Sequence, residues 1–196
     1  LRTVQAFPAD DVTLPVLDAA LERFPSSKDL TSVQTFVLLR RGDLVGARRL
    51  QVSDVLNEVI DRRPGDHWLL TNRAIAFGLA GQFDASIADF DRAVALAPKD
   101  SVLMASRAET KREMGRLEEA ADDFTTALRL DPSLIDVLVG RGEIFKQFGD
   151  YDRAIADFNT VISRDLGNPE AYACRGEVHR IQERWAAAVA DFTQAL

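Results

Sequence analysis

Small and aromatic residues recur every 34 positions from residue 67 to the end of the chain. Shifted by 34, four segments align: 67–100, 101–134, 135–168 and the truncated 169–196. Counted from one within each segment, position 8 is Ala or Gly, position 20 is Ser or Ala, and position 24 is Phe in all four. Positions 4, 8 and 11 share one helical face, and positions 20, 24 and 27 share another. The period therefore predicts a pair of helices in each segment.

The residues at the ends of these helices support the same division. Position 15 is Gly81, Gly115 and Gly149, then Glu183 in the last segment. Glycine readily adopts the left-handed conformation that ends many helices, so position 15 should close the first helix. Proline cannot continue a helix, and Pro98 and Pro132 at position 32 mark the end of the second. Leu166 replaces this proline in 135–168, so we expect local irregularity there.

Together these columns resemble the tetratricopeptide repeat family. The nearest segment, 135–168, contains GRGEIFKQFGDYDRAIADFNTVISRD. Lys111 and His179 depart from the aromatic residue that the family usually has at position 11. The resemblance implies an all-α fold, a right-handed α-solenoid of stacked antiparallel helix pairs. Segments 67–100, 101–134 and 135–168 are full repeats, and 169–196 is a truncated one.

The N-terminal third fits this frame less regularly. Residues 28–66 form an irregular extended repeat, in which Gly42 falls at position 15 and the closing Pro64 comes late. We expect its second helix to run from about Leu44 to Arg62. Residues 1–27 form a partial or irregular repeat, with one helix over 13–24. Because no Ser/Gly-rich or Pro-rich linker interrupts the chain, we predict one continuous solenoid over 1–196.

Two charged columns accompany the packing positions. Position 7 is Arg in four repeats and position 23 is Asp in the same four, and the irregular repeat loses both, with Gln34 and Leu50. An isolated buried charge is costly. We therefore interpret the columns as ion pairs that fix how helices stack, in preference to a ligand site. The sequence leaves both pairings open, within a repeat or between neighbouring repeats. The residues are Arg73, Arg107, Arg141 and Arg175, with Asp89, Asp123, Asp157 and Asp191.

Composition narrows the classes of function. The formal net charge of −7 argues against nonspecific binding to nucleic acid or to an anionic membrane. No apolar stretch approaches the roughly 20 residues that a spanning helix needs. Cys174 is the single cysteine, which excludes an internal disulfide and a cysteine-based zinc cluster. A reducing compartment such as the cytoplasm is favoured, and an exported form stays open.

The family resemblance also implies a concave groove lined by the first helix of each repeat, at positions 2, 5, 9, 12 and 13. The expected ligand groove in the N-terminal part is Phe36, Trp68, Thr71, Asn72, Ile75 and Leu79. In the C-terminal part its charged residues are Glu109, Arg112, Glu143, Lys146, Glu177 and Arg180. The same positions also include Val102, Ala105, Asp136, Val139, Glu170 and Ala173.

Two interpretations of this surface remain open. It is either a solvated charged face with a scattered apolar spot, or a peptide groove with a hydrophobic anchor and a polar track. In the second case Trp68 is the best candidate for a ligand contact, because exposed aromatic anchors often dominate binding energy. Each Glu is followed by a cation at i+3, so the two can neutralise each other on one helix. The Lys and Asn clamp by which some family members hold a chaperone carboxylate tail is absent, with Thr71 and Ile75 at two of its positions.

The sequence offers no catalytic constellation. His67 and His179 lie in separate repeats without metal-binding spacing, and we expect structural roles for both. Cys174 has no neighbouring base in sequence to activate it, which favours a packed thiol over a nucleophile. Phosphate-binding loops and nucleophile elbows are missing. We therefore expect no enzyme activity, no cofactor and no metal.

The expected function is a protein–protein interaction module, a scaffold or adaptor that binds a protein or peptide partner in its groove. The alternative is a regulatory or substrate-docking domain of a larger enzyme, and a structural spacer is a third option. The last hairpin contains Ile181, Trp185 and Phe192 without a capping helix. We expect that the natural protein continues; the other possibility is self-association through this edge.

Overall fold

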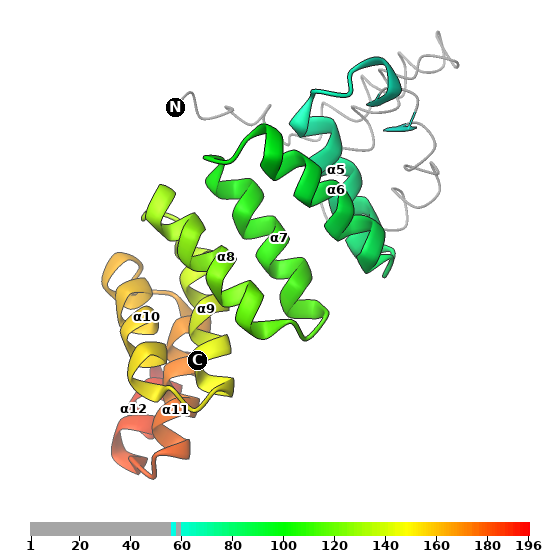
Figure 1. Cartoon of the computed structure of the whole chain (residues 1–196). Helices are drawn as coiled ribbons and strands as arrows, with labels where there is room; N and C mark the ends of the chain where they lie inside the picture. The colour runs from blue at the N-terminus through cyan, green and yellow to red at the C-terminus, as the bar shows by residue number, and fades with distance from the viewer. Residues whose placement is uncertain (1–55, 58–59) are drawn as a thin grey trace, which may run out of the picture. The chain divides into compact units, whose positions relative to one another are not determined.

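The computed structural model describes residues 56–57 and 60–196, and all regular elements in that part of the chain are α-helices. The chain divides into two compact units, 1–98 and 99–196. In the first, α5 (His67–Leu79) packs against α6 (Phe83–Leu96). The second contains three such pairs: α7 (Ser101–Glu113) with α8 (Leu117–Leu130), α9 (Ile135–Gln147) with α10 (Tyr151–Arg164), and α11 (Pro169–Ile181) with α12 (Trp185–Gln194) (Figure 1).

The helix boundaries follow the 34-residue period. Each first helix begins at position 1 of its repeat and ends at position 13, and each second helix begins at position 17. The predicted fold of stacked helix pairs is thereby confirmed for the described repeats. The expected helices over 13–24 and 44–62 lie wholly or largely outside the described residues. The single continuous solenoid over 1–196 stays a prediction.

The turn within each pair depends on a left-handed residue at position 15. Gly81, Gly115 and Gly149 have φ between +73° and +76°, and Glu183 has φ +57° in the last repeat. The predicted role of position 15 is therefore confirmed, and it holds even where the residue is not glycine. A left-handed conformation is unfavourable for a residue with a Cβ atom, so Glu183 is a strained substitute.

Phe at position 24 and a small residue at position 8 form the centre of each pair. Phe90, Phe124 and Phe158 are all buried, as the equivalence of the repeats requires. A Cβ atom placed on Gly142 would lie 2.6 Å from Cε1 of Phe158. The small residue therefore permits the close approach of the two helices that the sequence predicted.

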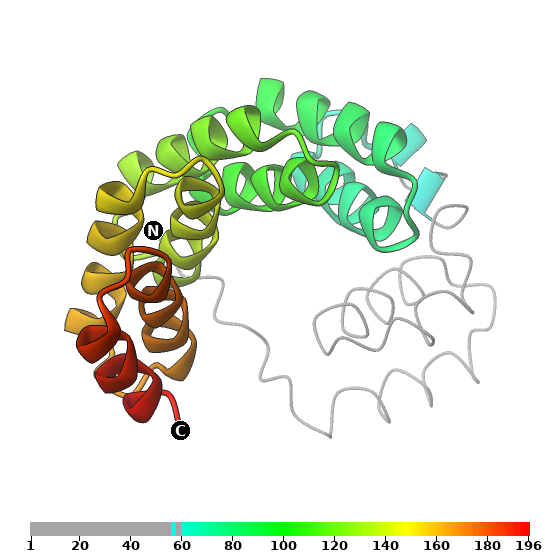
Figure 2. The same ribbon diagram turned by 90° about the horizontal axis from the view of Figure 1, so that it is seen from below.

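The second unit has two layers. In Figure 2, α7, α9 and α11 lie on its inner side, and α8, α10 and α12 lie on its outer side. Successive repeats meet where α8 contacts α9, where α10 contacts α11, and where α9 contacts α11. The core between the last two repeats includes Phe158, Val161, Ala171 and Val178. This packing places the first helices of three repeats side by side.

The Arg and Asp columns form ion pairs within each repeat, 16 residues apart. In the four repeats from residue 67 to 196, the Arg Nε and Nη2 atoms donate to the two carboxylate oxygens of the Asp, at distances from 2.5 to 2.9 Å. All four Asp residues are buried. The predicted pairing is confirmed, and the open choice is resolved in favour of pairing inside the repeat.

The third guanidinium nitrogen links neighbouring repeats. Nη1 of Arg141 donates to Thr125 Oγ1 at 3.2 Å, and Nη1 of Arg175 donates to Asn159 Oδ1. Both acceptors lie in the second helix of the preceding repeat, at position 25. Each of these Arg side chains therefore ties its own helix pair together and also fixes its position on the pair before it.

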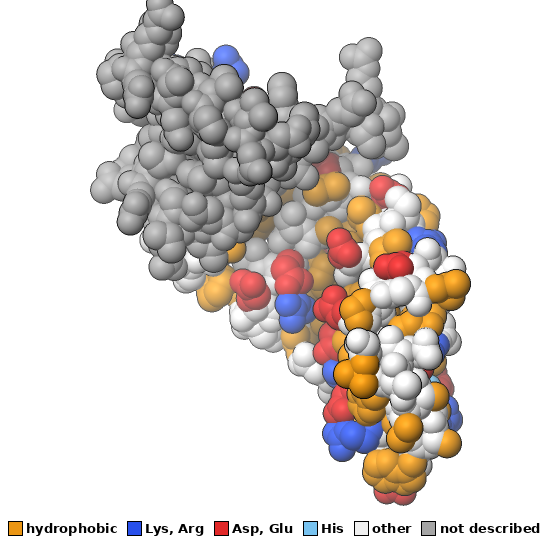
Figure 3. All heavy atoms as spheres, turned by 180° about the vertical axis from the view of Figure 1, so that it is seen from behind, with side chains coloured by type: hydrophobic (Ala, Val, Ile, Leu, Met, Phe, Trp, Pro, Cys, Tyr) orange, Lys and Arg blue, Asp and Glu red, His pale blue; other side chains and the backbone are white. Residues whose placement is uncertain are grey.

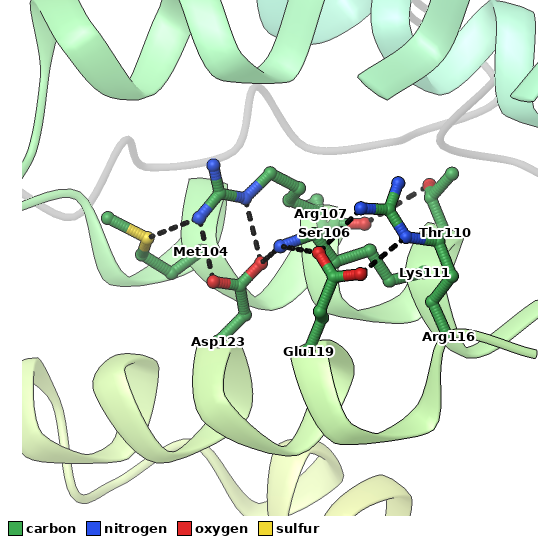
Figure 4. A network of polar contacts seen from close by, with 8 residues as sticks. All are labelled: Met104, Ser106, Arg107, Thr110, Lys111, Arg116, Glu119 and Asp123. Carbon is green, nitrogen blue, oxygen red and sulfur yellow. Dashed lines mark hydrogen bonds and ion pairs between the residues drawn. The ribbon is translucent and has the colours of Figure 1, made fainter. Parts of the chain in front are cut away.

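Lys111 adds a second cation to one of these pairs. Its Nζ atom lies 2.7 Å from Asp123 Oδ2 and 3.7 Å from Glu119 Oε2, although the residue is only 7% exposed. Figure 4 shows Arg107 and Lys111 of α7 pointing toward Asp123 and Glu119 of α8. The departure from the aromatic residue at position 11 therefore replaces an apolar contact with an ion pair.

Candidate functional site

A pocket of about 640 Å³ lies in the second unit, along its inner helices α7, α9 and α11. All its lining residues belong to the first helices of three successive repeats. They are Glu109, Arg112, Asp136, Val139, Gly140, Glu143, Lys146, Glu170, Ala173, Cys174 and Glu177. We call this surface the inner groove.

The inner groove repeats the same positions from one helix to the next. All its lining residues except Gly140 and Cys174 occupy positions 2, 5, 9 and 12, four of the five positions that the family resemblance implied. Gly140 and Cys174 are both at position 6, where Asn72 was the one residue predicted to line the groove and Cys174 was predicted only as a packed thiol. The helical spacing could have predicted that these two residues line the groove, because position 6 lies three residues before position 9 and shares its helical face.

Three carboxylates of the groove are paired on their own helix. Lys146 Nζ lies 2.7 Å from Glu143 Oε1, Arg112 Nε lies 3.0 Å from Glu109 Oε2, and Arg180 Nε lies 2.8 Å from Glu177 Oε2. The predicted i, i+3 neutralisation is confirmed. Arg180 does not line the pocket, but it forms an ion pair with Glu177, which does.

The charged pairs also influence one another across repeats. The hydrogen bonds that Arg112 donates to Glu109 raise the pKa of Arg112, and the charge of Glu143 in the next repeat raises it further. The hydrogen bond from Arg180 lowers the pKa of Glu177, and the charge of Lys146 in the preceding repeat adds to this effect. Figure 3 shows acidic and basic side chains next to one another on the surface of the molecule.

Asp136 and Glu170 differ from the paired carboxylates. Both occupy position 2, in the first turn of α9 and α11, and both are exposed. Within residues 56–57 and 60–196, neither has an ion-pair partner. An acidic residue in the first turn is stabilised by the helix dipole, which gives a structural reason for their presence.

Cys174 forms part of the groove wall. Burial raises the pKa of its thiol to about 12, and a hydrogen bond with Glu143 adds to the shift. At neutral pH the thiol therefore stays protonated, whereas a nucleophilic cysteine requires a thiolate. In the part of the chain that the structure describes, no group of three or more His, Cys, Asp or Glu side chains could hold a metal ion.

Five of the six residues predicted for the N-terminal part of the groove lie on α5, in the first unit. Trp68 and Leu79 are 41% and 39% exposed, whereas Thr71, Asn72 and Ile75 are half-buried. The Thr71 hydroxyl donates to the His67 carbonyl oxygen at 2.8 Å, as is common for threonine within a helix. Phe36 lies outside the described residues. A ligand contact at any of these positions stays a prediction.

None of the helices in the described residues is both long and apolar enough to span a membrane. This finding bears only on those helices.

Two comparisons with known proteins, with family models and with solved structures, find the same helical repeat. A model of the tetratricopeptide repeat family matches residues 71–135 and 139–196. A comparison with curated protein sequences gives no significant match.

Solved structures with the same architecture include that of MamA, which has 20% sequence identity and a TM-score of 0.71, over 81% of this chain and 90% of MamA. A tetratricopeptide repeat protein from Parabacteroides merdae has 19% identity and a TM-score of 0.68, over 91% of this chain and 69% of that one. YrrB, described as a repeat protein with an unusual peptide-binding site, has 13% identity and a TM-score of 0.68, over 95% of this chain and 91% of YrrB. At these identities the likeness concerns the fold.

Proposed function

This chain belongs to the tetratricopeptide repeat family, whose domains are generally protein-binding modules, and we propose that its inner groove holds a segment of a partner protein as a scaffold or adaptor. The observation that supports this most directly is the groove itself. Side chains from equivalent positions of α7, α9 and α11 line one pocket of about 640 Å³. YrrB, a structural neighbour, is described as having a peptide-binding site.

The dimensions of the groove suit an extended peptide. Packed helices lie ~8–10 Å apart, and an extended chain advances ~3.3 Å per residue. The step from one inner helix to the next therefore corresponds to about three peptide residues. The two steps between α7, α9 and α11 together correspond to about six peptide residues. Position 5 provides the small residue Ala173 where a peptide backbone would approach.

The proposal is tested by filling the groove. Random peptides are selected on phage against the wild-type protein, and their binding is measured by isothermal titration. We expect Ala173→Trp to weaken the selected peptides at least about tenfold, because the indole occupies their place. Ala156→Trp, at an exposed alanine of α10, is the matched control and should bind normally. Failure to select any peptide, or equal binding to both variants, would contradict the proposal.

We also propose that the 196-residue chain, taken by itself, associates with a second copy through the exposed face of α12. Trp185 and Val189 on this face are 61% and 65% exposed. Their equivalents in the preceding repeat, Tyr151 and Ile155, pack against the core between α10 and α11. Light scattering should show concentration-dependent dimers that Trp185→Lys abolishes, and a monomer at all concentrations would refute the idea.

A further inference from the structure

We propose that the inner groove takes a basic segment of a partner protein, whose Lys or Arg side chains reach Asp136 and Glu170. This inference rests on the proposed function and specifies the chemistry of the partner.

The charges of the groove do not balance. The lining contains five carboxylates and two cations. Glu109, Glu143 and Glu177 each form an ion pair with a cation on their own helix. The partner of Glu177 is Arg180, which does not line the pocket. The two position-2 carboxylates remain without an ion pair among the described residues. A cation from a partner would therefore meet uncompensated negative charge.

An acidic segment would meet the opposite situation. Arg112 and Lys146 already hydrogen-bond with Glu109 and Glu143, and such pairs would have to be broken to receive a new anion. The N-terminal ends of α9 and α11, which favour anions through the helix dipole, already have their own carboxylates. Both places where an anion could be held are therefore occupied by groups of the protein.

The base of the groove suits the aliphatic part of a long basic side chain. The uncharged residues of the lining, which we take as this base, are Val139, Gly140, Ala173 and Cys174. Gly140 lies against the Phe124 ring, since a Cβ atom placed there would be 3.0 Å from Cζ. Lys and Arg commonly lay their methylene groups on apolar surface while the charged end reaches polar groups. Here those groups are the exposed carboxylates at the start of each helix.

The repeat also sets the spacing of the basic residues. Asp136 and Glu170 are equivalent residues of adjacent repeats, so their helices lie ~8–10 Å apart. In a fully extended peptide, residues i and i+2 point to the same side and lie ~6.6 Å apart. In a polyproline II conformation, residues i and i+3 point to the same side and lie ~9 Å apart. We therefore expect two Lys or Arg residues separated by one or two others.

The test compares three peptides that are identical except at two positions, which are Lys, Gln or Glu. Binding of each is measured by fluorescence polarisation at low and high salt. We expect the Lys peptide to bind most tightly and to weaken as salt rises. The double variant Asp136→Asn, Glu170→Gln should weaken the Lys peptide about three- to tenfold, as the loss of two partly exposed charge contacts implies.

A matched control removes the same charges elsewhere. Glu118→Gln with Asp152→Asn changes two exposed first-turn residues of the outer helices α8 and α10. This control changes the net charge by the same amount and loses the same helix-dipole contribution, so it should bind the Lys peptide as wild type does. If both double variants weaken binding equally, the peptide responds to net charge alone and the inference is wrong.

Cys174 supplies an independent measure of groove occupancy, because it is the single cysteine and lines the pocket. Because the raised pKa keeps most of the thiol protonated, its alkylation by an excess of the uncharged reagent N-ethylmaleimide is slow, and its rate is measured over hours. A bound peptide should slow this alkylation further. Protection by the Lys peptide that the groove variant reduces supports the inference. Equal or stronger protection by the Gln or Glu peptide overturns the basic preference but keeps the groove as a peptide site. If no peptide binds or protects, both the inference and the proposed function fail.

Discussion

Asp123 should be more important for stability than its equivalent Asp157, because it holds two cations. Arg107 donates twice to Asp123 at 2.7 Å, and Lys111 Nζ lies 2.7 Å from the same carboxylate. Arg141 donates two hydrogen bonds to Asp157, at 2.9 and 2.7 Å. Position 11 of that repeat is Phe145. The two sites therefore differ chiefly in one buried lysine.

The perturbation is Asp→Asn at each site, which keeps the size of the side chain and removes its charge. Breaking a buried ion pair from one side costs about 3–5 kcal/mol, and we expect Asp157→Asn near the lower end. At Asp123 a second cation also loses a hydrogen bond to a charged group, which adds ~1.5–3 kcal/mol. Domains are stabilised by about 5–15 kcal/mol in total, so the difference is large enough to measure.

Urea unfolding followed by circular dichroism at 222 nm measures the effect. With an m-value of about 2 kcal/mol/M, the midpoint of Asp123→Asn should lie roughly 1 M below that of Asp157→Asn. Lys111→Phe restores the aromatic residue of position 11, and in that background the cost of Asp123→Asn should fall to that of Asp157→Asn. Two results would refute the assignment of Lys111 to this carboxylate. One is equal midpoints for the two single variants; the other is an Asp123→Asn substitution that costs as much stability in the Lys111→Phe background as in the wild type.

Three further substitutions test other features by urea midpoints. Glu183→Gly should stabilise by ~0.5–1 kcal/mol, because glycine adopts the left-handed conformation of this turn without strain; an unchanged midpoint would contradict this. Gly142→Ala should destabilise by about 1 kcal/mol, since overpacking against Phe158 costs ~1–3 kcal/mol and the gain in helix propensity is ~1 kcal/mol; a stabilised variant would show that the helices can separate. Burial lowers the pKa of His179 below its usual 6.5, so below that pH the unfolded chain binds the proton more readily and stability falls as pH falls. His179→Phe should remove this part of the loss between pH 7 and 5, and the same pH dependence in both proteins would count against it.

The sequence by itself determined the repeat and much of its local structure. The 34-residue period located the helices of the described repeats, because side-chain size and turn residues act within a few positions along the chain. Gly81 and its equivalents marked the left-handed turns for the same reason. The pairing of Glu143 with Lys146 was also predictable, since residues three apart on one helix are neighbours wherever the helix lies.

The tertiary structure decided the contacts between helices. The Arg and Asp columns predicted a pair, but only the packing of two helices showed that Arg141 reaches Asp157 of its own repeat and also Thr125 of the preceding one. The packing of successive repeats likewise decided that α7, α9 and α11 line one pocket, although positions 6 and 9 share a face within each helix. Such contacts depend on how one helix rotates and approaches another. That geometry arises from the packed core as a whole, and the order of residues along a single helix does not specify it.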